Sequence, residues 1–170
     1  YLKDWIKDIY TARKNKQQSS KESFFNNLAK NEDLLTSKFQ NVDDIKFRHL
    51  ELTNASNQKV EATLVYITNL IDKEVINNHI LKPLLSEDNQ NLLHSQKDIE
   101  IISNKIIDAE NIERIDKVNK AVNDILAGKS ILLINHSPHV LSIATQGWEE
   151  RSVGRPVTER TVRGAVDSFT

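Results

Sequence analysis

The sequence predicts an α/β fold in which helices pack on a small mixed sheet, preceded by an N-terminal helical segment. Two observations lead to this prediction. A helical pattern of apolar residues ends at Gly128, a residue type that often closes helices in the left-handed conformation, and residues 131–134 follow at once without a polar side chain. A strand without polar residues is typical of one covered on both faces. We therefore expect residues 131–134 to form the centre of the sheet.

The helix before this strand should present one apolar face, and Asp116 is placed to cap its start. Because the apolar face must cover the strand that follows, we expect Ile125 and Leu133 to belong to one core. The residues of this face recur at i, i+3, i+4, i+7 and i+8, and they are Val118, Ala121, Val122, Ile125 and Leu126.

Length and composition are those of an ordinary globular domain. The chain has 170 residues, of which 38% are hydrophobic and 28% charged, enough for one core and a second small one. A net charge of -1 gives no electrostatic reason to expect nucleic acid or an anionic membrane surface as a partner. The sequence contains neither a signal peptide nor a run of about 18 apolar residues, the length that a membrane helix requires.

The residue types that are missing also restrict the interpretation. The chain has no cysteine, which excludes disulfides and thiolate metal sites and fits a reducing compartment. It begins at Tyr1 and contains no methionine, so we expect it to be a fragment of a longer protein.

Residues 1–40 are expected to form a helical, amphipathic segment. A narrow apolar stripe predicts a first helix of about four turns that fades into a polar loop at residues 14–20, and a second helical pattern follows, with room for a break at Asn31. We expect this segment to pack on the domain's own core, with docking on a partner as the alternative. The stripe consists of Leu2, Trp5, Ile6 and Ile9, and the second pattern of Phe24, Phe25, Leu28, Leu34, Leu35 and Phe39.

Residues 41–146 are predicted to form the α/β subdomain. Residues 45–52 and 60–67 are rich in strand-favouring side chains, and a polar turn joins them, so they should be antiparallel neighbours. Asp72 should cap a helix that runs to Leu81 and ends before Pro83. The residues of this helix expected to point inward are Val75, Ile76, His79 and Ile80.

The rest of this subdomain alternates short elements and loops. Residues 86–91 are expected to be a polar connection. Residues 99–107 could be helix or strand, and the helical spacing of their isoleucines favours helix. We expect a short strand at residues 112–115 and another at residues 140–145, after the loop 136–139.

The last residues of a phosphate-binding-loop motif match Gly128, Lys129 and Ser130, but this chain differs from the motif in two respects. The first glycine of that motif would fall at Asn123, inside the predicted helix. The helix also precedes the loop and presents its C-terminus, whose partial charge repels phosphate. We therefore expect a helix end here and no nucleotide site.

The histidines do not form a recognisable site. His136 and His139 are separated by a turn that contains Pro138, and zinc would need a third and a fourth ligand, so a surface turn is the better interpretation. His79 is expected to be a core histidine, and no serine or carboxylate pair can be assigned to a base. We therefore expect no catalytic residue, no cofactor and no metal.

Residues 147–170 differ in composition from the rest of the chain and are interpreted as a strap that leads to a second subdomain. Four of the seven arginines of the chain lie here among glutamates, and Gly and Pro residues interrupt any regular element. The alternative is a solvated linker of mixed charge. The strap residues that we expect at an interface between subdomains or subunits are Trp148, Arg151, Pro156, Glu159, Arg163 and Gly164.

The strap resembles a signature of the A subunits of spore germinant receptors, the GerA-type spore germination proteins. The resemblance rests on residues 147–151, on Pro156 and Glu159, and on residues 162–164 leading to Phe169, and residues 64–85 and 122–134 agree with it. It covers residues 31–170. One departure is that the family usually has proline and a charged residue where this chain has Ala165 and Val166.

This resemblance implies a piece of a larger membrane protein that carries its membrane helices further along the chain. In the family, a hydrophilic N-terminal region with two α/β subdomains lies on the cytosolic face of the spore inner membrane. It works with B and C subunits, and with other A subunits as further candidates, in sensing nutrients and releasing ions. The implied function is receptor assembly or signal relay without enzymatic activity. The alternative is a module that binds the small-molecule germinant between subdomains, and the misordered loop disfavours a nucleotide-dependent enzyme.

Overall fold

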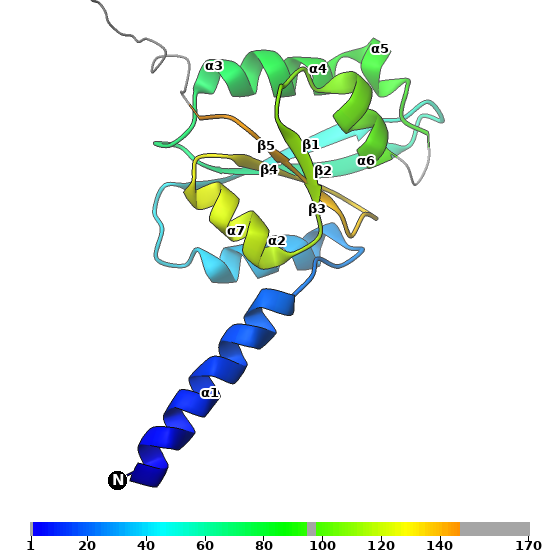
Figure 1. Cartoon of the computed structure of the whole chain (residues 1–170). Coiled ribbons are helices and arrows are strands. Elements are labelled where there is room, and N and C mark those ends of the chain that lie inside the picture. The colour runs from blue at the N-terminus through cyan, green and yellow to red at the C-terminus, as the bar shows by residue number, and fades with distance from the viewer. Residues whose placement is uncertain (1, 95–97, 147–170) are drawn as a thin grey trace, which may run out of the picture.

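The computed structural model describes residues 2–94 and 98–146, with the backbone alone for residues 11–20. Its elements form three layers, a sheet between two groups of helices, and α1 projects from one side (Figure 1). The strands are β1 (Ile45–Thr53), β2 (Lys59–Ile67), β3 (Ile112–Ile115), β4 (Ser130–Ile134) and β5 (Val140–Ile143). The helices are α1 (Leu2–Lys21), α2 (Leu28–Lys38), α3 (Lys73–Val75), α4 (Lys82–Leu85), α5 (Glu87–Gln90), α6 (Asp98–Ile101) and α7 (Val118–Leu126), with the wider π-helical segments η1 (Ile76–Leu81) and η2 (Ile102–Ile106).

The five strands in the described part of the chain form one sheet in the order β1-β2-β4-β5-β3. β4 lies in the middle and all of its residues are buried, which confirms both the α/β class and the predicted central strand. β1 and β2 are antiparallel neighbours, as expected. The remaining pairings are antiparallel too, so the expected mixture of parallel and antiparallel strands is not found. Tight connections after β1 and after β4 reverse the chain, and strands joined in that way run antiparallel.

Two hydrophobic cores lie on the two faces of the sheet. On one face the sheet packs against α4 and the helices around it, with Leu64 and Leu132 among the residues of this core. On the other face it packs against α2 and α7, and this second core contains both Ile125 and Leu133. Their predicted membership of one core is therefore confirmed. Neighbouring residues of β4 point to opposite cores because side chains alternate along a strand.

The helical segment from Lys73 to Leu85 departs from prediction at its centre. Asp72 caps it as expected, since its side chain accepts a hydrogen bond of 2.9 Å from the Glu74 backbone N–H. His79, which was expected in the core, is exposed, and its Nδ1 lies 3.7 Å from Asp108 Oδ2. The π turn of η1 fits more residues into each turn and thereby shifts the helical phase. Pro83 does not end the segment, because the helical backbone continues through it as far as Leu85.

The N-terminal segment differs from prediction in three places. The stripe expected to pack on the domain's own core is exposed instead, because α1 projects away from the sheet (Figure 1); its residues are Leu2, Trp5, Ile6 and Ile9. The residues expected to form a loop, 14–20, continue α1 as far as Lys21. Asn31 does not break α2 but is buried inside it. Its amide accepts a hydrogen bond of 2.7 Å from the Phe25 N–H and donates one of 2.8 Å to the Phe25 carbonyl. The Asn31 side chain thus supplies the hydrogen-bond partners of the Phe25 backbone, which lies before α2.

The start and the end of α7 are also corrected. The residue before its first turn is Lys117 and not Asp116, and no side chain caps this end. The Asp116 carbonyl instead accepts a hydrogen bond of 3.0 Å from the Phe24 N–H. Leu126, expected on the buried face, is 52% exposed.

The remaining elements agree with prediction apart from small details. Residues 99–107 are mainly helical, and residues 112–115 form an edge strand. The buried isoleucines of the helical part are Ile99, Ile102, Ile106 and Ile107. The predicted polar connection contains the short helix α5, and β5 ends at Ile143. Among the described helices, none is both long enough and apolar enough to cross a bilayer.

Candidate functional site

The turn between α7 and β4 has the geometry of a helix end and not of a phosphate-binding loop. Gly128 has a φ of +92°, the left-handed conformation that glycine adopts without strain. Its N–H donates to the Ile125 carbonyl at 3.1 Å, and the Lys129 N–H donates to the Asp124 carbonyl at 2.9 Å. These two bonds satisfy helix carbonyls in the manner of a Schellman motif. The predicted helix end is thus confirmed, and the amides that a phosphate would need are engaged with the helix.

Ser130, the third residue of the apparent motif, is also engaged. It is buried, and its hydroxyl lies 2.8 Å from the Thr145 hydroxyl. Thr145 in turn donates to the Gly128 carbonyl at 3.1 Å. The serine therefore joins the start of β4 to the segment after β5, and its side chain faces the interior.

A buried carboxylate lies next to this turn. Asp124 is only 5% exposed, and it accepts hydrogen bonds from the Ser142 hydroxyl at 2.7 Å and from the Lys120 ammonium at 2.8 Å. The hydrogen bond to Asp124 is the main cause that raises the pKa of Lys120 above its ordinary value, against the smaller opposing effect of burial. Lys120 also lies 3.6 Å from Glu113 on β3. This group of side chains therefore joins α7 to β5 and to the edge strand β3.

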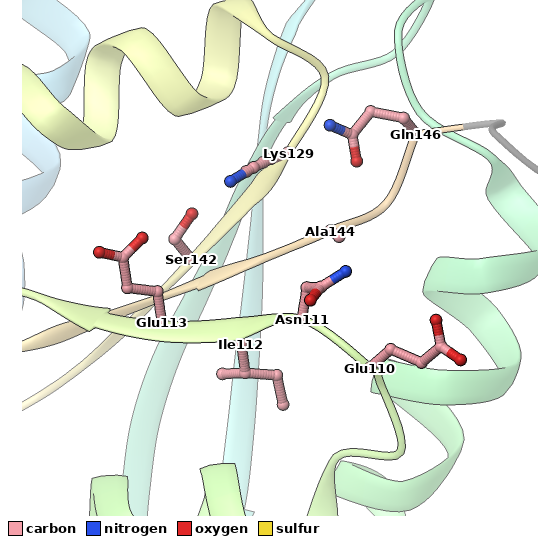
Figure 2. Close-up of a pocket in the computed structure, with 8 residues that line it drawn as sticks. All are labelled: Glu110, Asn111, Ile112, Glu113, Lys129, Ser142, Ala144 and Gln146. Carbon is pink, nitrogen blue, oxygen red and sulfur yellow. The ribbon is translucent and has the colours of Figure 1, made fainter.

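A hollow of about 520 Å³ opens beside this network. Figure 2 shows Lys129 between Gln146 on one side and Ser142 and Glu113 on the other. The remaining lining comes from residues 110–112 and Ala144. The polar groups of this lining are two carboxylates, an ammonium group, two amides and a hydroxyl. The hollow lies where the described chain ends, at Gln146.

A second hollow of about 490 Å³ shares Glu110, Asn111 and Ala144 with the first. It extends toward the start of the α3 helix and is lined there by Asp72 and Glu74. The two hollows therefore lie next to each other and share part of their lining. We call their combined lining the sheet-end groove.

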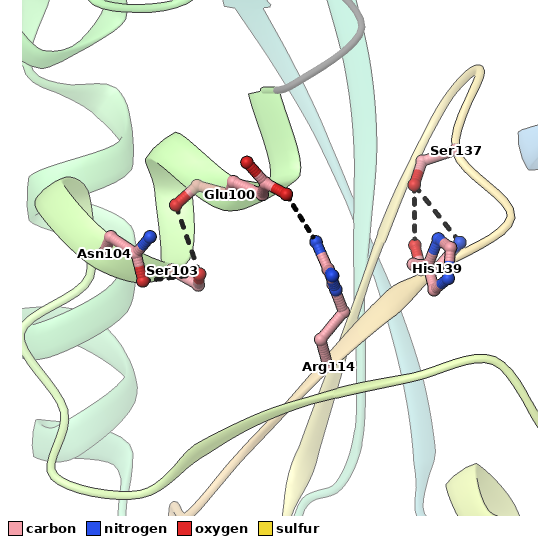
Figure 3. A network of polar contacts seen from close by, with 6 residues as sticks. All are labelled: Glu100, Ser103, Asn104, Arg114, Ser137 and His139. Atoms are coloured by element: carbon pink, nitrogen blue, oxygen red, sulfur yellow. Dashed lines mark hydrogen bonds and ion pairs between the residues drawn. The ribbon is translucent and has the colours of Figure 1, made fainter.

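The histidine turn 136–139 is held by local bonds. The Ser137 hydroxyl donates to the His139 carbonyl at 2.9 Å and accepts from the His139 N–H at 3.2 Å (Figure 3). Both contacts are with backbone atoms, so serine and imidazole are not arranged here as a nucleophile and its base. His136 has a φ of +66°, which belongs to a tight turn. The interpretation of this segment as a surface turn is confirmed.

Figure 3 also shows an ion pair that holds the edge of the sheet. Arg114 on β3 donates to Glu100 on α6 at 3.0 Å, and both side chains are about half exposed. Exposed pairs of this kind contribute about 1 kcal/mol or less. Within residues 2–94 and 98–146, no three histidine, aspartate or glutamate side chains gather as ligands for a metal ion.

The strap residues predicted for an interface lie outside the described residues. They are Trp148, Arg151, Pro156, Glu159, Arg163 and Gly164. Two residues with clear structural roles were missed by sequence reasoning. Asp124 stands next to Ile125, three residues after Ala121, and a carboxylate at the margin of an apolar face was the available signal. Asn31 lies between apolar positions of α2 in the same way, although its polarity allows a break in the helix there.

The described contacts define a class of protein, a three-layer α/β domain whose buried polar side chains bond to one another across its elements. The model of the Bacillus/Clostridium GerA spore germination protein family matches residues 33–170. The chain therefore belongs to this family, as its resemblance predicted.

The similar proteins agree with this assignment. The crystal structure of the N-terminal domain of the A subunit of the Bacillus megaterium spore germinant receptor GerK3 superposes with a TM-score of 0.63 at 31% identity, over 74% of this chain and 49% of that one. Spore germination protein KA of Bacillus subtilis is 24% identical over 84% of this chain and 25% of that protein. An uncharacterized membrane protein, YfkQ of Bacillus subtilis, is 26% identical over 85% of this chain and 26% of that protein. The chain thus spans about a quarter of the length of these curated relatives.

Proposed function

We propose that this chain is the cytosolic-side N-terminal part of the A subunit of a nutrient germinant receptor. Its role is to assemble the receptor or to relay germinant sensing to ion release during spore germination. The full-length protein then lies in the spore inner membrane and acts with B and C subunits and with other A subunits. The observation that carries this proposal is the common fold, at 31% identity, with the N-terminal domain of the GerK3 A subunit.

The side-chain contacts support a non-enzymatic role. Asp124, Ser130, Ser142 and Thr145, the buried polar residues around the turn after α7, bond to one another, to Lys120 or to the backbone. Such a network fixes helices on a sheet and keeps these groups buried, whereas a catalytic group must be within reach of a substrate. A rigid domain of this kind is suited to relay a signal or to anchor another part of the receptor.

The strap extends this proposal beyond the described residues. We place Trp148, Arg151, Pro156, Glu159, Arg163 and Gly164 at an interface with a second subdomain or with another subunit. Arginine and glutamate pairs contribute most where they are partly desolvated, because a guanidinium group can donate two parallel hydrogen bonds to one carboxylate. An interface therefore gives these residues a role that a solvated linker does not.

The test uses spores from which the genes of the other germinant receptors are deleted. Restoring the full-length gene that encodes this chain should restore germination with at least one nutrient class. A gene that lacks the segment for residues 1–170 should not restore it, and the co-purifying B and C subunits show whether assembly or relay has failed. Equal germination with both genes contradicts the proposal.

The sheet-end groove favours a second candidate function, the binding of the small-molecule germinant. Its charged lining of Glu113, Lys129 and Glu110 suits a zwitterion, and it lies beside the last described residue, where a second subdomain would begin. Calorimetric titration of the chain with amino acids, sugars and ATP tests this candidate. Heat from an amino acid or a sugar that Glu113→Gln abolishes would support it, and an absence of heat from all three classes would leave the assembly role.

A further inference from the structure

The first helix carries an apolar face that none of the described residues covers. Trp5 is 62% exposed and Tyr10 69% exposed, and the other members of this face are Leu2, Ile6 and Ile9. These five residues recur at i, i+3, i+4, i+7 and i+8, so they lie along one side of the helix. We call them the α1 apolar face. Figure 1 shows that it lies at the far end of a helix that projects from the body.

The base of α1 is fixed to the body, so the helix has a definite direction. Ser23 and Lys117 form an antiparallel bridge, the Val118 N–H donates to the Glu22 carbonyl at 2.9 Å, and Lys117 donates to the Ser23 hydroxyl at 2.8 Å. Lys38 adds an ion pair with Glu22 at 3.1 Å. The α1 apolar face therefore begins roughly 17 Å from this attachment, at the 1.5 Å rise per residue of a helix.

Such a helix needs a partner to be stable. An isolated helical stretch shorter than about 12 to 15 residues is marginal in water, because the entropy of ordering it is not offset by burial. Large apolar side chains gathered on one exposed side also mark a surface that binds something. Both arguments apply to the half of α1 between Leu2 and Tyr10.

The charge of α1 indicates what this partner is. The helix has six basic and two acidic residues, whereas the rest of the chain has 17 basic and 22 acidic residues, so the net charge of -1 conceals a strongly basic helix. Lys3 and Lys7 fall by their spacing next to the α1 apolar face, and Lys21 falls on the same side of the helix, roughly 17 Å nearer its base than the last residue of that face. Asp4 and Asp8 fall on the other side.

We propose that α1 binds the surface of an anionic lipid bilayer, lying in the interface with its apolar face among the acyl chains and its lysines at the phosphate groups. A basic helix that is polar over most of its surface and carries aromatic residues on one face has the composition of helices that lie in a membrane surface. Trp5 and Tyr10 each combine an apolar ring with a polar group, and such side chains prefer the level of the headgroups.

A second copy of this chain is a weaker explanation for the same face. A coiled coil requires apolar heptads sustained over at least about three or four repeats, and the α1 apolar face ends at Tyr10. Pairing two copies of α1 would also bring two strongly basic helices together, whereas a surface of lipid phosphates has the opposite charge. Charge and length therefore both favour lipid.

The test measures sedimentation of the 170-residue chain with vesicles of phosphatidylcholine, with and without phosphatidylglycerol. The chain should bind the vesicles that contain phosphatidylglycerol, and added salt should weaken the binding. Replacing Lys3, Lys7 and Lys21 together by glutamine should reduce affinity on the order of a hundredfold, at about fivefold for each charge. The matched control is the same replacement at the exposed Lys46, Lys59 and Lys73, which should leave affinity nearly unchanged.

The apolar contribution is tested in the same assay. Ile6→Ser should weaken binding by roughly tenfold, because its side chain leaves the acyl region, and Leu126→Ser, at an exposed apolar residue of α7, should not. In a Trp148→Phe chain, whose remaining tryptophan is Trp5, fluorescence emission should shift to shorter wavelength when phosphatidylglycerol vesicles are added.

Four results would overturn the proposal. Three are absence of binding by the unaltered chain, equal binding by the α1 lysine variant, and an unshifted Trp5 emission. The fourth is a dimer in lipid-free solution, measured by light scattering, that Ile6→Ser dissociates, because it would assign the α1 apolar face to a second copy. Circular dichroism of each variant shows that the body remains folded, which is expected because the altered side chains lie away from both cores.

Discussion

Two amphipathic helices, α7 and α1, have opposite surroundings. Val118, Ala121 and Ile125 of α7 are fully buried against the sheet, whereas Trp5 and Tyr10 of α1 are mostly exposed. α7 lies between β3 and β4, two strands of the same sheet, so the chain connections at both ends hold it on that sheet. In the described structure α1 is attached only at its end near Ser23. An apolar stripe therefore predicts that a face is covered, and the connections of the helix decide what covers it.

The largest expected effect lies in the core under α7. Ile125→Ala and Leu133→Ala should each lower the free energy of unfolding by roughly 2 to 5 kcal/mol, the range for truncation of fully buried aliphatic residues. Trp5→Ala, on the exposed helix, should change it by less than about 0.5 kcal/mol. Urea unfolding of the 170-residue chain measures all three. Losses below about 1 kcal/mol at both core positions would contradict the packing of α7 on the sheet.

The next effect concerns the buried carboxylate that ties α7 to the sheet. Asp124→Asn should cost roughly 1.5 to 3 kcal/mol, because the amide replaces a charged acceptor of two hydrogen bonds. A double-mutant cycle with Ser142→Ala should show that the two substitutions are not additive, since they remove the same bond. Additive costs would mean that this bond does not hold α7.

The pH dependence of stability tests the contribution of Lys120, the lysine of the same network. Asp124 raises the pKa of Lys120 above its ordinary value of 10.5. The contribution of the charged lysine is therefore complete below pH 10.5 and disappears as the pH rises through the folded-state pKa. The stability difference between the unaltered chain and Lys120→Met should stay constant up to that pH and shrink above it. A constant difference at higher pH would show that packing, and not charge, is responsible.

A smaller loss is expected at the turn that ends α7. Gly128→Ala should cost about 1 to 3 kcal/mol, because alanine resists a φ of +92°. Its Cβ would also lie 2.9 Å from the Leu70 carbonyl oxygen and from Gln146 Cγ. Thermal unfolding measures the change. A melting temperature equal to that of the unaltered chain would show that the helix can end in another way.

Substitutions in the strap, like those on α1 and unlike those in α7, should leave the stability of the isolated chain unchanged. Arg151→Ala and Arg163→Ala should impair germination of spores that carry the full-length receptor, because we place both residues at an interface. The melting temperature of the isolated chain should not change, and immunoblotting of the A subunit controls for its abundance. Normal germination in both variants would mean that the strap is a plain linker, where exposed ion pairs contribute at most about 1 kcal/mol.

The smallest effect is expected at Lys129. Lys129→Ala should change stability by less than about 0.5 kcal/mol, since the structural role of this residue lies in its backbone N–H, which donates to the Asp124 backbone carbonyl. Germination should also remain normal under the assembly role. A large loss of germination with an intact fold would instead favour a ligand in the sheet-end groove, where Lys129 is part of the lining.

Sequence patterns predicted those parts of the fold in which local signals and tertiary packing agree. Residues 131–134 are apolar throughout, and only the middle of a covered sheet accommodates such a strand. Gly128 and Asp72 were recognised because a positive φ and a helix cap each require particular residue types. The family resemblance rested on residues of the strap, and the family match over residues 33–170 confirms it.

The errors arose where a polar residue has a role that only the folded chain reveals. Asn31 was only a candidate break in the helical pattern, yet it bonds to the backbone of Phe25, which precedes the helix. The π turn placed His79 outside the core, and the expected α-helical period could not show this shift. The sheet-end groove combines Glu113, Lys129 and Gln146, which lie on three separate segments, so no spacing in the sequence could have grouped them.

The turn after α7 also controls where the described domain ends in space. Gly128 touches the loop at Leu70 and the side chain of Gln146 at once, with no room for a methyl group between them. The backbone after β5 is held at the same place, because the Thr145 hydroxyl donates to the Gly128 carbonyl and the Asp72 N–H donates to the Thr145 carbonyl at 2.7 Å. The point of exit at Gln146 is thus a rigid junction of three loops, and its position depends on one residue that has no side chain.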